Sequence, residues 1–388
     1  MNTKKQTATQ HLFTNKQLRT LLVPIMVEQL LSSLMGTADT MMVSNVGSAA
    51  ISAVSLVDAI NILVIQALSA LAAGGAILCS QYLGSQSLKK AKRSAEQVLF
   101  VMLVLSCSLS LLCLIFRFPL LRLIFGTVDT DVMANSQIYF FFTLLSFPFI
   151  GLYDAGASIL RAQNNTKGPM TISILSNFLN IGGNAILIFV FGMGVAGAAI
   201  STLVSRIFCA IVVIWQLRNP AEQIYVRNYF SIRPDWSLIK RVLFIGIPSG
   251  IENSMFQFGK LAIQSTVSTL GTVAIAAQAM TSILEALNGI AAMGVGIGLM
   301  TVVGQCIGAK RKDEAIYTSK GCPGFRKSSS SSPVPSSICS QSLSPSSVAW
   351  KQKAPASACR WSHLLPSPNR FRGCFPLFPP TACAQPAM

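Results

Sequence analysis

The apolar residues of this chain gather in long stretches with few polar interruptions. Each stretch reaches about 20 residues or more, the length that a helix needs to cross the hydrocarbon core of a bilayer. Only helices and closed barrels can satisfy every backbone N–H and C=O in lipid, and barrel strands are shorter and alternate in polarity. The pattern therefore predicts an all-α polytopic membrane protein with about 8 transmembrane helices, near 20–45, 51–79, 97–116, 136–160, 169–192, 195–217, 242–268 and 273–305.

Two of these stretches carry matching sequences. The first contains VPIMVEQLL and the seventh contains IPSGIENSM, so that Pro24 matches Pro248 and Glu28 matches Glu252. Further matching residues follow at the same sequence separation as these two pairs, without a gap, over about 60 residues. This indicates a duplication. Six spans, an even number, separate the two starts. This predicts two parallel six-helix repeats related by an axis along the membrane normal, with the second repeat incomplete.

The matching pattern breaks off near residue 320. The segment that would repeat the third helix, 321–340, reads GCPGFRKSSSSSPVPSSICS and cannot cross a bilayer. A stretch rich in Ser and Pro without acidic residues indicates either a disordered tail or translation in a shifted reading frame, and the abrupt break favours the second. We expect a cytoplasmic N-terminal arm at 1–17, an N-lobe with six helices at 18–217, a cytoplasmic inter-lobe loop at 218–238, two C-lobe helices in 239–308, a cytoplasmic loop at 309–320 and an aberrant, disordered tail at 321–388.

Composition and charge agree with a membrane protein and indicate its orientation. The chain is 52% hydrophobic and 11% charged, against roughly 25% charged residues in soluble domains. Basic residues precede the first helix, follow the second and surround the connection between the sixth and seventh, which predicts a cytoplasmic N-terminus. The formal net charge of +17 is dispersed among loops, so we expect no nucleic-acid partner.

The sequence gives little support to catalysis or to metal chemistry. It has 2 His and no CxxC pair, so a metal site would have few ligands. No GxxxxGK[ST] motif supports ATP hydrolysis, and no pairing of a nucleophile with a base suggests an enzyme. We expect neither enzymatic activity nor a cofactor.

Two carboxylates lie inside the first apolar stretch, where an acid costs roughly 2.5–3.5 kcal/mol on insertion scales. Glu28 and Asp39 share one helix face, because their separation is three turns plus about 20°. Asp39 lies on the outer half of the helix, within reach of an ion from outside. We expect both to bind a coupling cation or proton. One alternative is a purely structural Asp39. The other is a role for Glu28 in lobe architecture, because Glu252 occupies the same position in the second repeat.

The fifth stretch carries amides on a single face. Ser173, Asn177, Asn180 and Asn184 follow at spacings of 4, 3 and 4 residues. Their carbonyl oxygens can coordinate a cation, and the alternative is interhelical hydrogen bonding. The eighth stretch has a similar polar face, and helix 2 carries acid and amide groups at repeat-related positions. We expect a substrate cavity lined by Glu252, Asp58, Glu285, Asn177 and Gln278.

Several motifs resemble the multidrug and toxic compound extrusion (MATE) transporters. In the first helix they are Pro24, Glu28 and the run Asp39-Thr40 with Met42-Val43, followed by Val46-Gly47. Further along the chain they are AAISAVSL, CSQYLGSQ with its echo GQCIGAKRKDEA, LRAQNNTKGPM and GVAGAAIST. The resemblance covers about residues 1–320 and implies two six-helix lobes that exchange external Na⁺ or H⁺ for cytoplasmic organic cations.

The resemblance also assigns roles to single residues. Asp39 matches the helix-1 aspartate implicated in cation or proton binding, and Asn180 and Asn184 match the helix-5 cation site. Many relatives have Asp where this chain has Asn184, which removes one charge. Phe256 stands at the position of the helix-7 glutamate found in the best-known Na⁺-coupled branch. A Na⁺ held by Asp39, Asn180 and Asn184 is the only metal that the resemblance implies.

These observations predict a secondary active multidrug antiporter in the cytoplasmic membrane of a bacterium. We expect it to act as a monomer in the lipid bilayer, with small organic cations as substrates, and to be impaired by loss of most of its C-lobe. One alternative is a lipid-linked oligosaccharide flippase of the same superfamily, which would favour basic cavity residues such as Arg206 and Lys260. The other alternative is a non-functional membrane fragment.

Overall fold

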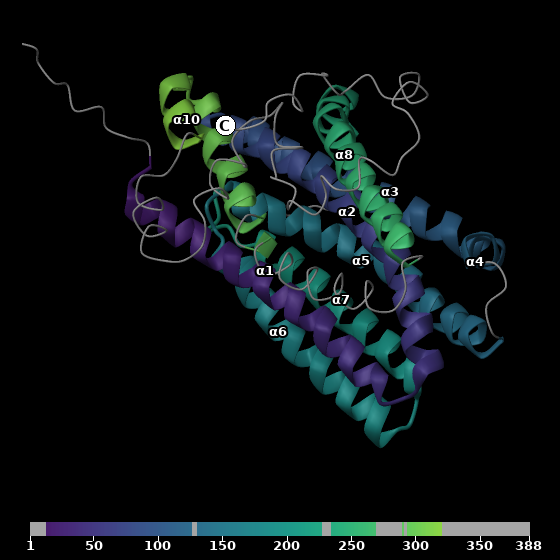
Figure 1. Ribbon diagram of the computed structural model, residues 1–388. Coiled ribbons are helices and arrows are strands. Elements are labelled where there is room, and N and C mark those ends of the chain that lie inside the picture. Colours follow the sequence, from purple (N-terminus) through teal and green to yellow (C-terminus); the bar gives the residue numbers. More distant parts are fainter. Residues whose placement is uncertain (1–12, 126–129, 227–233, 269–288, 291–292, 320–388) are drawn as a thin grey trace, which may run out of the picture. The chain divides into compact units, whose positions relative to one another are not determined.

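The computed structural model describes residues 13–125, 130–226, 234–268, 289–290 and 293–319. Within these ranges the regular elements are helices and no strand occurs, which confirms the all-α prediction. They are α1 (Asn15–Ser44), α2 (Ser48–Gly84), α3 (Leu88–Ile115), α4 (Arg117–Phe125), α5 (Thr130–Ala162), α6 (Lys167–Asn184), the π-helix η1 (Ala185–Val190), α7 (Gly194–Leu217), α8 (Trp236–Ser268), the helix Met293–Gly308 and α10 (Lys312–Ser319) (Figure 1). The predicted tail at 321–388, most of the N-terminal arm, part of the inter-lobe loop and the first part of the eighth stretch lie outside the described residues.

Local sequence explains how α1 and α2 begin. Thr14 and Gln17 form a capping box, in which the Thr14 N–H donates to Gln17 Oε1 at 2.8 Å and the Gln17 N–H donates to Thr14 Oγ1 at 3.4 Å. Pro24 lies inside α1, where it removes one backbone donor from the helical ladder. Gly47 has φ 138°, a conformation that favours glycine, and turns the chain from α1 into α2.

The structure differs from the predicted spans in two places. The connection after α3 contains the short apolar helix α4, in which Pro119 stands in the first turn, where its missing N–H breaks no helical bond. The fifth stretch, expected as one helix over 169–192, divides into α6 and η1. π-Turns inside helices frequently mark functional sites, and η1 begins directly after Asn184.

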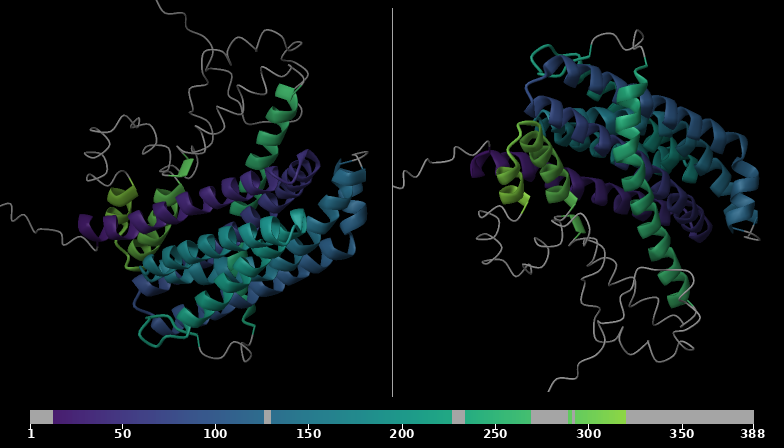
Figure 2. Two further views of the ribbon diagram at one scale, coloured as in Figure 1. Left: turned by 90° about the horizontal axis from the view of Figure 1, so that it is seen from below. Right: turned by 90° about the horizontal axis from the view of Figure 1, so that it is seen from above.

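Helices of the two repeats meet in equivalent contacts. Gly74 of α2 approaches Gly246 of α8 so closely that a Cβ on Gly74 would lie 2.8 Å from the Gly246 nitrogen. The repeat-related pair, Gly298 and Leu22 of α1, is in contact as well. Thus α8 packs on α2, while α1 packs on the helix Met293–Gly308 (Figure 2). These equivalent contacts confirm that the matching sequences are structural repeats.

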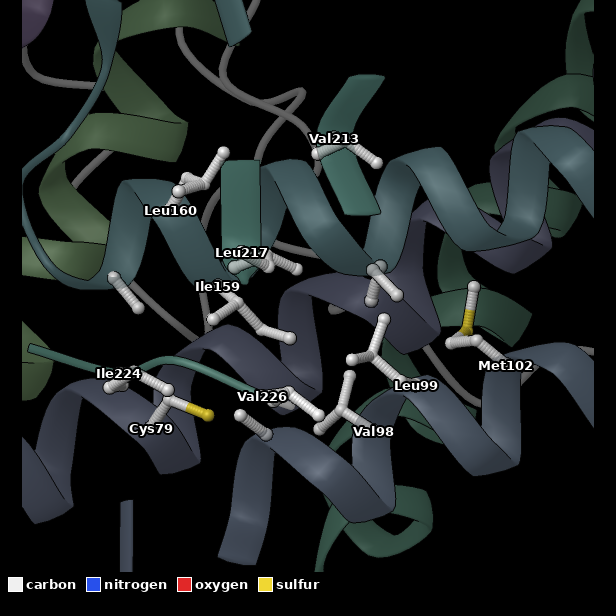
Figure 3. Close-up of a cluster of buried hydrophobic side chains, with 14 of the residues drawn as sticks. Cys79, Val98, Leu99, Met102, Ile159, Leu160, Val213, Leu217, Ile224 and Val226 are labelled. Atoms are coloured by element: carbon white, nitrogen blue, oxygen red, sulfur yellow. The ribbon is translucent and has the colours of Figure 1, made fainter. Parts of the chain in front are cut away.

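The larger apolar cluster lies between α2, α3, α5 and α7. Figure 3 shows these side chains converging, joined by two residues from the segment after α7. Because lipid is as apolar as the side chains themselves, close packing rather than transfer out of water holds such helices together. The labelled residues are Cys79, Val98, Leu99, Met102, Ile159, Leu160, Val213, Leu217, Ile224 and Val226.

Six helical spans are long and apolar enough to cross a membrane, namely α1, α2, α3, α5, α6 with η1, and α7. Their outer surfaces expose large apolar side chains, such as Trp215, which is 74% exposed, whereas polar side chains such as Asn180 are fully buried. Soluble proteins show the reverse arrangement. The chain is therefore an integral membrane protein. α8 covers the predicted seventh stretch, and Met293–Gly308 covers the end of the eighth.

Candidate functional site

Asp39 and Asn184 form the centre of a polar cluster between α1 and α6. Asn184 Nδ2 donates to Asp39 Oδ1 at 2.5 Å and to Asn180 Oδ1 at 3.4 Å. Both asparagines are 0% exposed, and Asp39 is half-buried. Asn180 and Asn184 share a face of α6 because four residues make about one turn. Helix α6 lies along α1, which carries Asp39 (Figure 1). The structure thus brings together three of the four residues predicted for cation or proton coupling.

Helix α7 positions Asn180 from the opposite side. Ser201 Oγ donates to the Asn180 backbone C=O at 2.8 Å, and Asn180 Nδ2 donates to Thr202 Oγ1 at 3.4 Å. Thr202 directs its own proton to the Ala198 C=O at 2.9 Å, so its oxygen is free to accept. Gly183 permits this approach, because a Cβ there would lie 2.5 Å from the Ser201 hydroxyl. The amide of Asn180 is therefore held in one orientation.

Two amide oxygens on this face of α6 have no hydrogen-bond donor among the described residues. They are Oδ1 of Asn177 and Oδ1 of Asn184, and both are buried. Buried polar atoms nearly always have a partner, and either acceptor can take a bound ion or a water. Amide and carboxylate oxygens suit hard cations. The donor set therefore fits an alkali cation bound at Asp39, or a proton on Asp39 itself.

Asp58 of α2 is a second interior carboxylate near this cluster. Its Oδ1 accepts from Asn61 Nδ2 at 3.2 Å and from the Tyr139 hydroxyl at 3.3 Å. Asp58 and Asp39 are close enough to repel each other electrostatically. Two carboxylates at this depth need compensating positive charge.

Arg206 of α7 supplies part of that charge. Its Nη1 donates to Ser146 Oγ at 2.6 Å, and its guanidinium attracts Asp39, Asp58 and Asp154. Because the Arg206 guanidinium already neutralises part of their charge, it limits how many further cations or protons these carboxylates can bind.

Glu28, the fourth residue predicted for coupling, lies apart from Asp39. Arg161 Nη2 of α5 forms an ion pair with Glu28 Oε1 at 2.5 Å, and the Tyr153 hydroxyl donates to the same oxygen at 3.0 Å. Glu28 is 4% exposed. Along one face of α1, Glu28 therefore connects to α5, whereas Asp39 connects to α6.

The residues predicted for the substrate cavity fall into three groups. Asp58 and Asn177 lie in the N-lobe interior as described above. Glu252 is exposed on α8. Gln278 and Glu285 lie outside the described residues.

Sequence reasoning missed several polar residues of the interior. Tyr139, Tyr153 and Asp154 of α5 were not singled out, and Arg161 lies in the last turn of α5, just beyond the predicted span 136–160. The signal for Asp154 was present, because it is an acid inside an apolar stretch. The roles of Ser201 and Thr202 carried no such signal, since hydroxyl side chains are common in apolar helices and bond their own backbone.

Comparisons with known proteins agree with this architecture. The MatE family model matches residues 24–186 and 248–319. The probable multidrug resistance protein NorM of Thermotoga maritima is 27% identical over 313 residues, which are 78% of this chain and 65% of that protein. The uncharacterized transporter YisQ of Bacillus subtilis is 28% identical over 298 residues, which are 75% of this chain and 64% of that protein.

Solved structures show the same fold. An outward-facing multidrug resistance MATE family transporter of the MOP superfamily superimposes with a TM-score of 0.73 at 22% identity, covering 79% of this chain and 67% of that one. The chain spans about 65% of the length of the curated relatives named above. Because the family model matches more than half of its residues, this chain belongs to the MatE family of multidrug and toxic compound extrusion transporters.

Proposed function

We propose that this chain acts in the export of cationic xenobiotics in exchange for Na⁺ or H⁺. The observation that carries the proposal is the cluster of Asp39, Asn180 and Asn184, in which a half-buried carboxylate lies beside an orphan amide oxygen. Such a cluster is suited to a small cation or a proton. Membership of the MatE family supports transport as the use of that site.

Exchange follows from competition for negative charge. An external cation or proton neutralises Asp39, and Asn184 and Asn177 offer oxygens to which no described residue donates. When the ion leaves, the free carboxylate favours an organic cation from the cytoplasm. The coupling ion and the organic cation bind the same negative charge, so they cannot occupy it together. Each therefore drives the release of the other as the lobes alternate between two orientations.

The organic cation would bind the polar residues of the predicted cavity. Glu252 is exposed on α8, and Asp58 and Asn177 line the interior of the N-lobe. Gln278 and Glu285 complete the proposed cavity. Carboxylates and amides, with apolar surface around them, suit cationic aromatic compounds.

The proposed setting is the cytoplasmic membrane of a bacterium, with a monomeric chain and its N-terminus in the cytoplasm. Basic residues on alternate connections support that orientation, because such loops stay on the cytoplasmic side. The relatives named above come from bacteria.

Arg206 favours drug export over the flippase alternative. A pyrophosphate headgroup would need basic side chains that are free to bind it. Arg206 instead has three carboxylates as electrostatic neighbours, Asp39, Asp58 and Asp154. Its positive charge is already balanced within the N-lobe.

The test is the dependence of thermal stability on the coupling ion. Purified protein in lipid nanodiscs is heated in NaCl or KCl at constant ionic strength, and separately over a range of pH. A ligand at 100 times its Kd stabilises the folded state by about 2.7 kcal/mol. We expect saturable stabilisation by Na⁺ or by protons, and its loss in Asp39→Asn.

The matched control is Asp131→Asn, which removes an exposed carboxylate at the start of α5. This variant should respond to the ion like the wild type. Equal stabilisation of wild type and Asp39→Asn in both arms would remove Asp39 from the coupling site.

A further inference from the structure

Asp154 is the one interior carboxylate of the N-lobe to which no described residue donates a hydrogen bond. It lies inside α5, and its Oδ2 is buried and unpartnered. Asp39 accepts from Asn184, Asp58 from Asn61, and Glu28 from Tyr153. An ionised carboxylate without a donor is costly at membrane depth.

The charges of the N-lobe interior do not balance. Four carboxylates, from Glu28, Asp39, Asp58 and Asp154, face two guanidinium groups among the described residues. Arg161 is committed to Glu28 by the 2.5 Å ion pair. Arg206 can neutralise one of the remaining three. Two negative charges are left, although the Asp39 site accounts for a single cation or proton.

The charged and titratable groups that act on Asp154 among the described residues lie on three helices. From α1 it faces Glu28, from its own helix Arg161, and from α7 Arg206 and Cys209. Helices α2 and α3 pack on α5 but add no charged group to this described set. Arg161 is engaged elsewhere and Glu28 repels, so among the described residues Arg206 is the cation that Asp154 can share.

We propose that Asp154 carries an exchangeable proton, and that Arg206 links its protonation to cation binding at Asp39. The second half of this proposal rests on the function proposed above. When a cation occupies Asp39, Arg206 is available to Asp58 and Asp154, and Asp154 releases its proton to water. When the cation leaves, Arg206 compensates Asp39, and Asp154 takes a proton from hydronium, forming an O–H bond and leaving water. The N-lobe then always carries the same net charge.

Infrared difference spectroscopy tests the first half directly. A protonated carboxyl has a C=O stretch that is separate from the amide band and shifts in D₂O, so acidic-minus-alkaline spectra of the protein in nanodiscs count exchangeable carboxyls. We expect Asp154→Asn to remove one such band, and the control Asp131→Asn, at the exposed start of α5, to leave that band in place.

Proton release on addition of Na⁺ tests the second half. With a pH indicator in weak buffer, the wild type should release protons, Asp154→Asn should lose that part of the release, and Arg206→Gln should separate Na⁺ binding from it. An Asp154 band without any response to Na⁺ would sink the Asp39 site while sparing the Asp154 proton.

The absence of a protonated carboxyl assignable to Asp154 overturns the proposal whatever Na⁺ does. If Asp154→Asn does not fold, Asp154→Glu still decides the question. Glutamate keeps the acid on a longer side chain, so the band should move in frequency if it belongs to residue 154, and an unmoved band contradicts the assignment.

Discussion

Gly84 of α2 lies directly against the backbone carbonyl of Gln305, in the helix Met293–Gly308. A Cβ at Gly84 would overlap that oxygen, and a Cβ at Gly308 would likewise overlap the carbonyl of Gln81. Gly84 and Gly308 are repeat-related, as are Gln81 and Gln305. The two repeats therefore touch through two equivalent contacts, one from each repeat. In addition, Gln305 Nε2 donates a hydrogen bond to the Ala162 C=O at 2.7 Å.

Gly84→Ala should destabilise the protein although alanine is the better helix former. Overpacking costs about 1–3 kcal/mol, and here the obstacle is backbone, which cannot move aside as a flexible side chain does. The loss should appear as a lower midpoint in thermal unfolding of the detergent-solubilised chain.

Gly36→Ala is the matched control, since a Cβ at Gly36 of α1 meets nothing within 4 Å. There the helical preference for alanine, up to about 1 kcal/mol, should appear as unchanged or higher stability. Equal effects of the two substitutions would show that the repeats do not touch at Gly84.

Breaking the ion pair of Glu28 and Arg161 should be strongly destabilising. Removing one partner of a buried pair leaves an uncompensated charge, at a cost of about 3–5 kcal/mol. We expect this loss in Glu28→Gln and in Arg161→Met, and a much smaller loss in the double variant, because no charge is then left alone. Unfolding midpoints of the four proteins give the coupling energy.

The pair of Arg93 and Asp235 provides the comparison for that cycle. Arg93 Nη2 lies 3.0 Å from Asp235 Oδ2, and the Arg93 side chain is 63% exposed. Its removal should change stability little, since solvent screens exposed charges. Additive effects of the Glu28 and Arg161 substitutions would mean that the two side chains do not form a pair in the membrane.

Asn184→Asp should strengthen cation binding. A carboxylate at this position adds a negative charge within hydrogen-bond distance of Asp39, at 2.5 Å in the present pair. We expect Na⁺ affinity to rise about tenfold or more, equivalent to about 1.4 kcal/mol. Na⁺ titrations monitored by thermal shift measure the change, and Asn184→Leu, which removes the amide altogether, should abolish binding. Unchanged affinity in both variants would place the ion elsewhere.

The helical architecture was predictable because lipid allows few alternatives. Long apolar stretches had to be helices, and the constant spacing of Pro24 and Pro248 identified the repeats before any contact was known. The π-helix after Asn184 was not predictable, since periodicity does not distinguish one wider turn from a continuous helix.

The candidate site was predictable only in part. Asn180 and Asn184 are four residues apart on one helix, so their shared face follows from geometry. That Glu28 meets Arg161 depends on how α1 crosses α5, which a single sequence does not specify. Helix crossing also decides which residues Arg206 and Asp154 face, so their electrostatic partners emerge only from the folded chain.

Competition between the coupling ion and an organic cation tests the central claim most directly. Binding of a fluorescent organic cation to the protein in nanodiscs is measured by anisotropy as Na⁺ or acidity increases. We predict that one of the two ions displaces the dye from the wild type, and that Asp39→Asn neither binds the dye tightly nor responds to the ion. Displacement that persists in Asp39→Asn, or dye binding unaffected by Na⁺ and by pH, would contradict exchange at this carboxylate.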